Sequence, residues 1–106
     1  MPRPRIVGVL LFPGFELLDV YGPLEMFGVL PEHFRIVTLG ERQGPVASAQ
    51  GPQGVVERTL DDPGPIDVLL VPGGIGTRSL ARNSVVLAFL RRLRPAVEYL
   101  ASICTG

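Results

Sequence analysis

Cys104 is the residue of this 106-residue chain whose type and setting most clearly suggest chemistry. It follows a predicted buried strand, 97–103, and Thr105-Gly106 comes directly after it. This arrangement is typical of a sharp strand-to-helix turn that pushes a side chain out of a sheet. A helix starting there would stabilise a thiolate through its N-terminal dipole. We therefore expect Cys104 to be a nucleophile, with a small buried structural cysteine as the alternative.

Asp19 is the second candidate, because it lies between Leu18 and Val20 in a mostly apolar stretch. A carboxylate placed there would be partly shielded from water and could hold and pass a proton. The alternative is an acidic residue that complements the dipole of a helix N-terminus. Glu16 and Glu25 are weaker candidates, since both are expected to face solvent.

Gly73 and Gly74 are the third candidate site, directly after the apolar run 66–71. Adjacent glycines allow backbone N–H groups to turn toward a bound anion or oxyanion, although a tight turn explains them equally well. Residues 74–79 half-match the dinucleotide-binding fingerprint, but Ser79 stands where its third glycine belongs. We therefore expect no nicotinamide or other cofactor. His33 is predicted to lie in a surface loop away from these segments.

Composition excludes several classes of function. Ten basic and ten acidic residues give no net charge and no basic run, so nucleic acid is not an expected partner. One Cys and one His cannot build an all-protein zinc site, so metal catalysis is not expected. The apolar run 6–12 is too short to span a bilayer, and no signal-peptide cleavage pattern follows it. These features predict a cytoplasmic protein that acts on a small molecule without a metal or a membrane.

The elements that must position these residues can be predicted from hydrophobic patterning. Near-continuous apolar runs predict buried parallel strands, and helical spacing predicts the helices. The expected strands are 5–12, 34–39, 66–71 and 97–103, with short extended pieces at 46–49 and 55–59. Three helical stretches are expected, at 16–30, after Thr77 and at 84–93. The first should be interrupted at Gly22-Pro23. This order predicts an α/β fold with a mostly parallel sheet covered by helices on both faces.

In such a sheet the carboxyl ends of adjacent parallel strands share one edge, where ligands bind. The three candidate segments each follow a predicted strand, so we expect them to converge. Because the chain stops where a further crossover helix is expected, residues 1–106 are predicted to be the first half of one domain, ending at the nucleophile turn. An isolated product of this length is expected to be poorly soluble and inactive.

Three segments together resemble the DJ-1/PfpI (ThiJ) superfamily, which shares its core with class I glutamine amidotransferases. They are Phe12–Pro23 with its Leu-Leu-Asp motif, Val71–Gly76, and Ser102–Gly106. The Asp and the Cys-Thr-Gly ending are most similar to the isonitrile hydratase branch. The resemblance implies a flavodoxin-like three-layer sandwich, a homodimer, and a reactive Cys104 contacted by Asp19. It also implies that Thr105 is the neighbouring hydroxyl residue, and that the N–H groups of Gly74 and Thr105 form an oxyanion-type pocket.

The resemblance leaves several functions open. An isonitrile hydratase would use the Cys104 thiolate to attack the isonitrile carbon, and hydration would release an N-substituted formamide. Thr105 stands where protease-like members have His, which argues against a peptidase. The same domain resembles the ligand-sensing half of some helix-turn-helix regulators. A redox or aldehyde-stress protein that senses oxidation at Cys104 is a third alternative.

Overall fold

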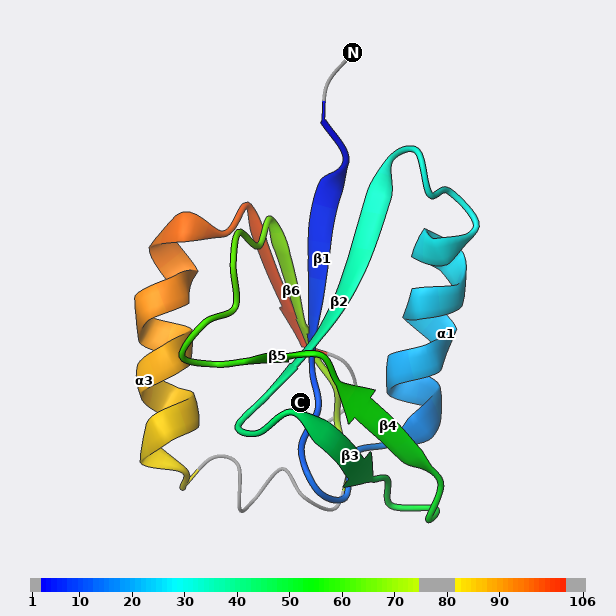
Figure 1. Cartoon of the computed structure of the whole chain (residues 1–106), viewed down its shortest axis with the longest axis vertical. Coiled ribbons are helices and arrows are strands. Elements are labelled where there is room, and N and C mark those ends of the chain that lie inside the picture. The colour runs from blue at the N-terminus through cyan, green and yellow to red at the C-terminus, as the bar shows by residue number, and fades with distance from the viewer. Residues whose placement is uncertain (1–2, 75–81, 103–106) are drawn as a thin grey trace.

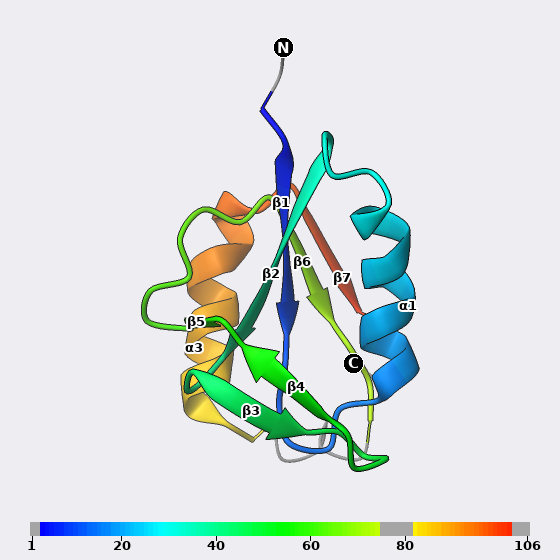
Figure 2. The same cartoon turned by 45° about the vertical axis from the view of Figure 1, so that its right-hand side comes forward.

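Five parallel strands form the central sheet of the computed structural model, which describes residues 3–74 and 82–102 (Figure 1). Their spatial order is β5-β2-β1-β6-β7. The strands are β1 (Arg5–Leu10), β2 (Phe34–Gly40), β5 (Arg58–Thr59), β6 (Val68–Val71) and β7 (Tyr99–Ser102). Helix α1 (Leu17–Gly28) and helix α3 (Ser84–Leu93) lie on opposite sides of this sheet, as Figures 1 and 2 show. The predicted parallel α/β sandwich is therefore confirmed.

The apolar runs of β1 and β6 form the centre of the core. Val7, Val9 and Leu10 of β1 are at most 1% exposed, and all four residues of β6 are buried. Both strands have a neighbouring strand on each side, and their side chains are covered by the helix layers rather than by water. Edge strand β7 differs, since Tyr99 and Leu100 remain exposed. This contrast explains why the central strands consist of Val and Leu almost throughout.

Helix α1 runs through Pro23, contrary to the predicted interruption at Gly22-Pro23. Proline cannot donate a helix hydrogen bond, and a break was expected for that reason. The helix continues because its inner face is held on the sheet by buried Val20 and by Leu24 and Phe27, which pack against the core. Phe27 also meets Phe34 of β2 edge to face, with ring centroids 4.8 Å apart. Tertiary packing thus outweighs the local signal.

Helix α3 has the predicted bounds, Ser84–Leu93. Its N-cap is Asn83, whose side-chain oxygen accepts hydrogen bonds from the backbone N–H groups of Val85 and Val86. This satisfies two donors that the first helical turn leaves unpaired. A 3-10 turn (Arg94–Ala96) follows, so β7 begins at Tyr99 rather than at residue 97. The helix predicted after Thr77 falls outside the described residues.

Residues 44–56 form a β-hairpin rather than the predicted turns around one extended piece. Strands β3 (Gly44–Ala47) and β4 (Gln53–Val56) pair antiparallel, and the predicted edge strand at 55–59 is divided. Its first part belongs to the hairpin, and Arg58–Thr59 pairs with the outer edge of β2. This Gly-, Pro- and Gln-rich tract has little period-2 alternation, so its patterning does not reveal which residues pair.

Asp67 holds the amino end of the sheet together, at the opposite end from the candidate site. Its carboxylate accepts two 2.7 Å hydrogen bonds from the Arg3 guanidinium and one of 2.8 Å from the Ile6 backbone N–H. Hydrogen bonding to Arg3, followed by that from Ile6, lowers the pKa of Asp67 to about 2. Nearby, an exposed Arg5–Glu98 ion pair lowers the pKa of Glu98 in the same direction. These pairs fasten the N-terminal segment to β6 and β7.

No helix in the described ranges, 3–74 and 82–102, has the length and apolar character needed to cross a membrane. Those ranges also hold no group of three or more His, Cys, Asp or Glu side chains that could bind a metal ion.

Candidate functional site at the carboxyl edge of the sheet

The carboxyl ends of β1, β6 and β7 meet at one edge of the sheet, as the sequence predicts. Strand β6 lies between the other two, and every pairing among them is parallel. The chain leaves β1 for α1 on one face and leaves β6 for α3 on the other, as Figure 2 shows. A crevice opens where adjacent strands continue to opposite faces, and this is the usual ligand position in open α/β sheets.

Asp19 lies in the first turn of α1 and is only 8% exposed. Its Oδ2 accepts a 3.0 Å hydrogen bond from the backbone N–H of Gly73, directly beyond β6. The bond joins residues 54 positions apart. It fixes the orientation of a buried carboxylate at the carboxyl edge of the sheet, where β1 and β6 end. The fold thus brings together two of the candidate segments, and it uses the N–H of Gly73 to hold Asp19.

Gly74 continues this contact with the loop between β1 and α1. The Gly73 carbonyl accepts a 2.9 Å hydrogen bond from the Glu16 N–H, and Gly74 forms an antiparallel bridge with Phe15. Gly74 has a φ of +132°, and a Cβ at this position would lie 2.3 Å from the carbonyl oxygen of Gly14. Only glycine fits so close to another backbone in this conformation. Glycine at position 74 is therefore required by the packing of the loop that carries Asp19.

Cys104 and Thr105 lie outside the described residues. The nearest described point is Ser102, the last residue of β7, which pairs in register with Val71 of β6. Gly73 and Cys104 each come two residues after a member of this pair. The predicted roles of Cys104 and Thr105 therefore stay predictions, as does that of Gly74 in an oxyanion pocket.

The hairpin tip contacts the same loop from the other side, which the sequence did not predict. The Gly14 N–H donates to the Ala47 carbonyl at 2.9 Å, and the Ala49 N–H donates to the Phe15 carbonyl at 2.8 Å. Gln50 reaches the start of α1, where its Oε1 accepts from the Leu17 N–H at 3.3 Å. Phe15 is consequently held between residues 48 and 74 and is fully buried. Local sequence offers no signal for these long-range backbone bonds.

Ser48, in the hairpin tip, is 6% exposed. Within the described part of the chain its hydroxyl oxygen has no hydrogen-bond partner. It lies opposite Phe15 in a parallel bridge, next to the loop that carries Asp19. A buried hydroxyl of this kind is destabilising unless something satisfies it.

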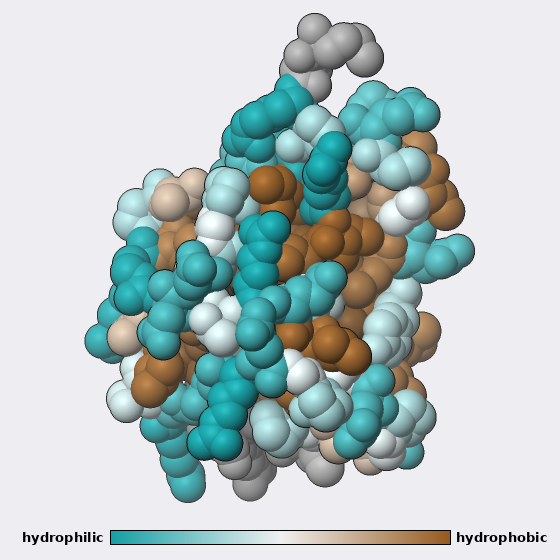
Figure 3. Space-filling view, in the orientation of Figure 1, coloured by the Kyte–Doolittle hydropathy of each residue, from teal (hydrophilic) through white to brown (hydrophobic). Residues whose placement is uncertain are grey.

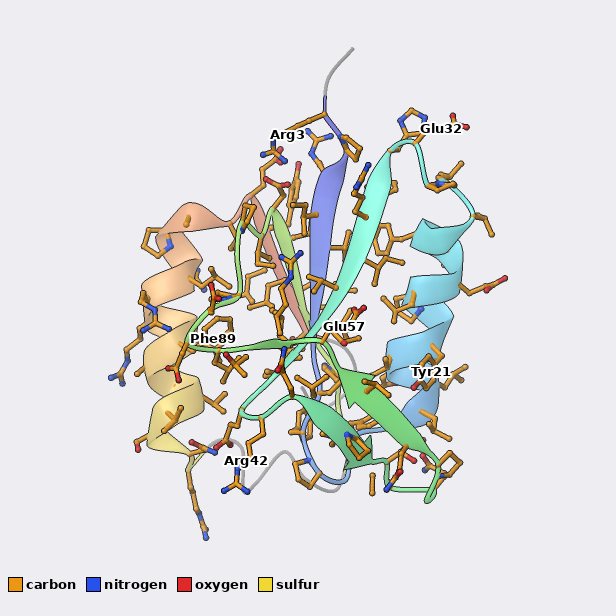
Figure 4. The ribbon with its side chains drawn as sticks, viewed as in Figure 1. Arg3, Tyr21, Glu32, Arg42, Glu57 and Phe89 are labelled. Atoms are coloured by element: carbon orange, nitrogen blue, oxygen red, sulfur yellow. The ribbon has the colours of Figure 1, made fainter. Side chains whose placement is uncertain are left out.

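Of the weaker candidates, Glu25 and His33 lie where the sequence predicts, whereas Glu16 is partly buried. Glu25 and His33 are exposed, and the His33 carbonyl accepts from the Arg5 N–H at the amino end of the sheet, far from the candidate site. Glu16 is the N-cap of α1 but its side chain makes no capping bond. Tyr21, labelled on α1 in Figure 4, meets Phe15 edge to face with ring centroids 6.5 Å apart, and it remains half exposed.

The model of the DJ-1/PfpI family matches residues 5–106, which include the Asp19 loop, the double glycine and the Cys-Thr-Gly ending. The chain belongs to the DJ-1/PfpI family. Isonitrile hydratase from Pseudomonas putida is 34% identical over 100 residues, which make up 94% of this chain and 43% of that protein. These matches confirm the resemblance drawn from the three segments.

Solved structures agree with this assignment. A ThiJ/PfpI family protein from Pseudomonas syringae superposes with a TM-score of 0.90 at 31% identity, covering 97% of this chain and 43% of that protein. A variant of a DJ-1 superfamily protein from Salmonella typhimurium gives a TM-score of 0.79 at 28% identity, covering 94% and 55%. The chain thus spans about half or less of the length of these relatives.

Proposed function

We propose that this DJ-1/PfpI chain provides the nucleophile and the proton donor of a cysteine-dependent hydratase that converts an isonitrile to an N-substituted formamide. The observation that carries the proposal is the buried carboxylate of Asp19, fixed by Gly73 at the carboxyl edge of the sheet. That edge also receives β7, whose last residue precedes Cys104 by two positions. Similarity to isonitrile hydratase supports the choice of substrate.

The reaction can be written with these residues alone. The Cys104 thiolate attacks the terminal carbon of the isonitrile and forms a C–S bond, while protonated Asp19 donates its proton to the same carbon. The product is a thioimidate bound to the protein. Water then adds to that carbon, one of its protons passes to nitrogen and the other returns to Asp19. Cleavage of the C–S bond releases the formamide and restores the thiolate, so covalent catalysis divides one difficult hydration into two steps.

Electrostatic support would come from the surrounding backbone. The N–H groups of Gly74 and Thr105 are the donors that the family resemblance assigns to charge developing on the substrate. The hydrogen bond from the Gly73 N–H keeps the carboxyl group oriented before the substrate arrives. A carboxyl group oriented in advance lowers the entropic cost of proton transfer.

The test is formamide production from n-butyl isonitrile by the full gene product, followed by NMR. We expect activity in the natural protein, none in Cys104→Ala, and a loss of about 100-fold or more in Asp19→Asn, the range typical of general acid catalysis. Glu25→Gln is the matched control, because it removes one carboxylate from the exposed side of α1. Full turnover by Cys104→Ala would overturn the proposal. A natural protein that folds, forms no formamide and is oxidised at Cys104 by peroxide would favour a redox role instead.

We also propose that the protein is a homodimer that buries the outer side of α1. Leu18, Met26 and Val29 are 75%, 73% and 64% exposed, and half-exposed Tyr21 adjoins them. The space-filling view shows hydrophobic surface along the α1 side of the molecule (Figure 3). Glu25 is the one exposed charged residue of the helix, so two copies could pack here with little charge to desolvate. The outer side of α1 is thus the contact surface that we assign to the dimer implied by the family resemblance.

A further inference from the structure

A cavity lies behind the Asp19 loop, on the side of the sheet covered by α3. It has a volume of about 520 Å³ and is bounded by the end of β1, the turn between β2 and β3, strand β3 and the first turn of α3. Ligand pockets commonly measure about 300–1,000 Å³, so this space is large enough for a small molecule. Asp19, Gly73 and Gly74 do not line it. The segment 10–13 forms one of its walls and separates it from them.

The floor of the cavity is apolar. Leu10, Leu11, Phe12 and Val86 all line it and are at most 5% exposed as residues. No charged side chain comes from this part of the lining. A ligand would therefore gain most by placing a compact hydrocarbon group against the floor.

The rim carries three polar side chains, two of which already have partners. The Glu41 carboxylate accepts a hydrogen bond from the Asn83 side chain, at the N-cap of α3. The Gln43 amide nitrogen donates to the Glu57 carbonyl at 2.9 Å. Arg42 is different, since its guanidinium makes no ion pair or hydrogen bond with any residue that the structure describes. Figure 4 shows Arg42 beside this turn, at the carboxyl end of the sheet.

We propose that this cavity binds a small carboxylate with a compact apolar body. The hydrocarbon part would lie on the floor formed by β1 and Val86, and the carboxylate would pair with Arg42 at the rim. Arginine suits this role because its planar fork matches a carboxylate with two parallel hydrogen bonds. The proposal does not depend on hydratase activity, because none of the residues invoked belongs to the Asp19 site.

The test compares three probes with the same six-carbon chain and different charge: hexanoate, hexanamide and hexylammonium. The full gene product is titrated with each at millimolar concentration, and its backbone amide shifts are followed by NMR. We expect hexanoate to shift the amides of residues 41–44, 46, 47 and 86 and to bind about five- to tenfold more tightly than hexanamide, as one partly exposed ion pair allows. Hexylammonium should bind more weakly than both.

Two variants and one control make the assignment specific. Arg42→Gln should remove the preference for hexanoate over hexanamide, whereas Arg35→Gln, a change at another exposed arginine on β2, should leave it intact. Ala47→Leu should fill part of the cavity from an exposed position and weaken all three probes. The proposal is overturned if hexanoate produces no shifts, if its shifts lie on the outer side of α1, or if Arg42→Gln binds it unchanged.

Discussion

Asp19 and Gly73 are joined by a 3.0 Å hydrogen bond that links the first helix to the end of β6 across 54 residues of chain. The contact places a buried carboxylate where β1 and β6 continue to opposite faces of the sheet. The same hydrogen bond orients both partners, because Asp19 holds the double-glycine turn in place and the turn holds the Asp19 carboxylate. The orientation of the Asp19 carboxylate and the stability of the loop are therefore coupled.

Asp19→Ala should destabilise the protein by about 1–3 kcal/mol, since it removes the acceptor of a buried N–H. Asp19→Asn keeps an acceptor oxygen in nearly the same place and should recover most of that loss. Urea unfolding of the two variants measures the difference. Formamide production measured in parallel separates structure from chemistry, because Asn cannot donate a carboxyl proton. Equal stability of the Ala variant and the natural protein would show that the Gly73 contact contributes nothing.

Gly74→Ala should destabilise the protein by about 3 kcal/mol or more, through a clash with the Gly14 backbone added to the strain of a positive φ. Gly44→Ala is the matched control, because Gly44 has a φ of +112° but nothing within 4 Å of its added Cβ. The control should lose only the stability that the positive φ costs an alanine, about 1–2 kcal/mol. Thermal or urea unfolding of both variants gives the comparison. Similar losses would mean that the close approach to residue 14 is relaxed easily.

Much of this site could be predicted from the sequence, for a definite physical reason. Continuous apolar runs predict parallel strands, and parallel strands place Asp19 and Gly73 at the same edge. For residues 44–56 the sequence predicts short extended pieces but not their pairing, because the Gly, Pro and Gln residues there have little periodicity. The continuous α1 was missed because packing of Val20 and Phe27 outweighs the effect of Pro23. The ion pair between Arg3 and Asp67 was not predicted, because in the sequence an aspartate at the start of a strand looks like any other surface charge.

Ser48→Ala should leave stability unchanged or raise it by up to about 1 kcal/mol, because it removes a buried hydroxyl that lacks a partner among the described residues. Thr38→Val is the contrasting variant. The Thr38 hydroxyl donates to the Val55 carbonyl and accepts from the Glu57 N–H at 3.0 Å, so its loss should cost about 1–2 kcal/mol. Chemical denaturation of both variants tests this. A clear loss in Ser48→Ala would indicate that a bound water or ligand satisfies the hydroxyl.

Stability should fall as the pH drops from about 4 to 2, partly because of Asp67. The pKa of Asp67 is about 2 in the folded protein, below the ordinary 3.8, so its contribution is present above about pH 4 and is lost as the group is protonated. The shift corresponds to roughly 2 kcal/mol, reduced by solvent screening around the exposed Arg3. Asp67→Asn should flatten the acid limb measured by urea unfolding. Glu98→Gln should change it less, since both members of that pair are about half exposed.

Met26→Glu should convert a dimer to a monomer if two copies meet through the outer side of α1. Each copy would place a new carboxylate in an apolar contact, where desolvating an unpaired charge costs several kcal/mol. Val55→Glu is the control, because Val55 is 61% exposed but lies on the hairpin rather than on α1. Sedimentation velocity of the full gene product and both variants gives the masses. The contact would be refuted if the natural protein sediments as a monomer. It would also be refuted if Met26→Glu stays dimeric while Val55→Glu dissociates, and the apolar side of α1 would then have another role.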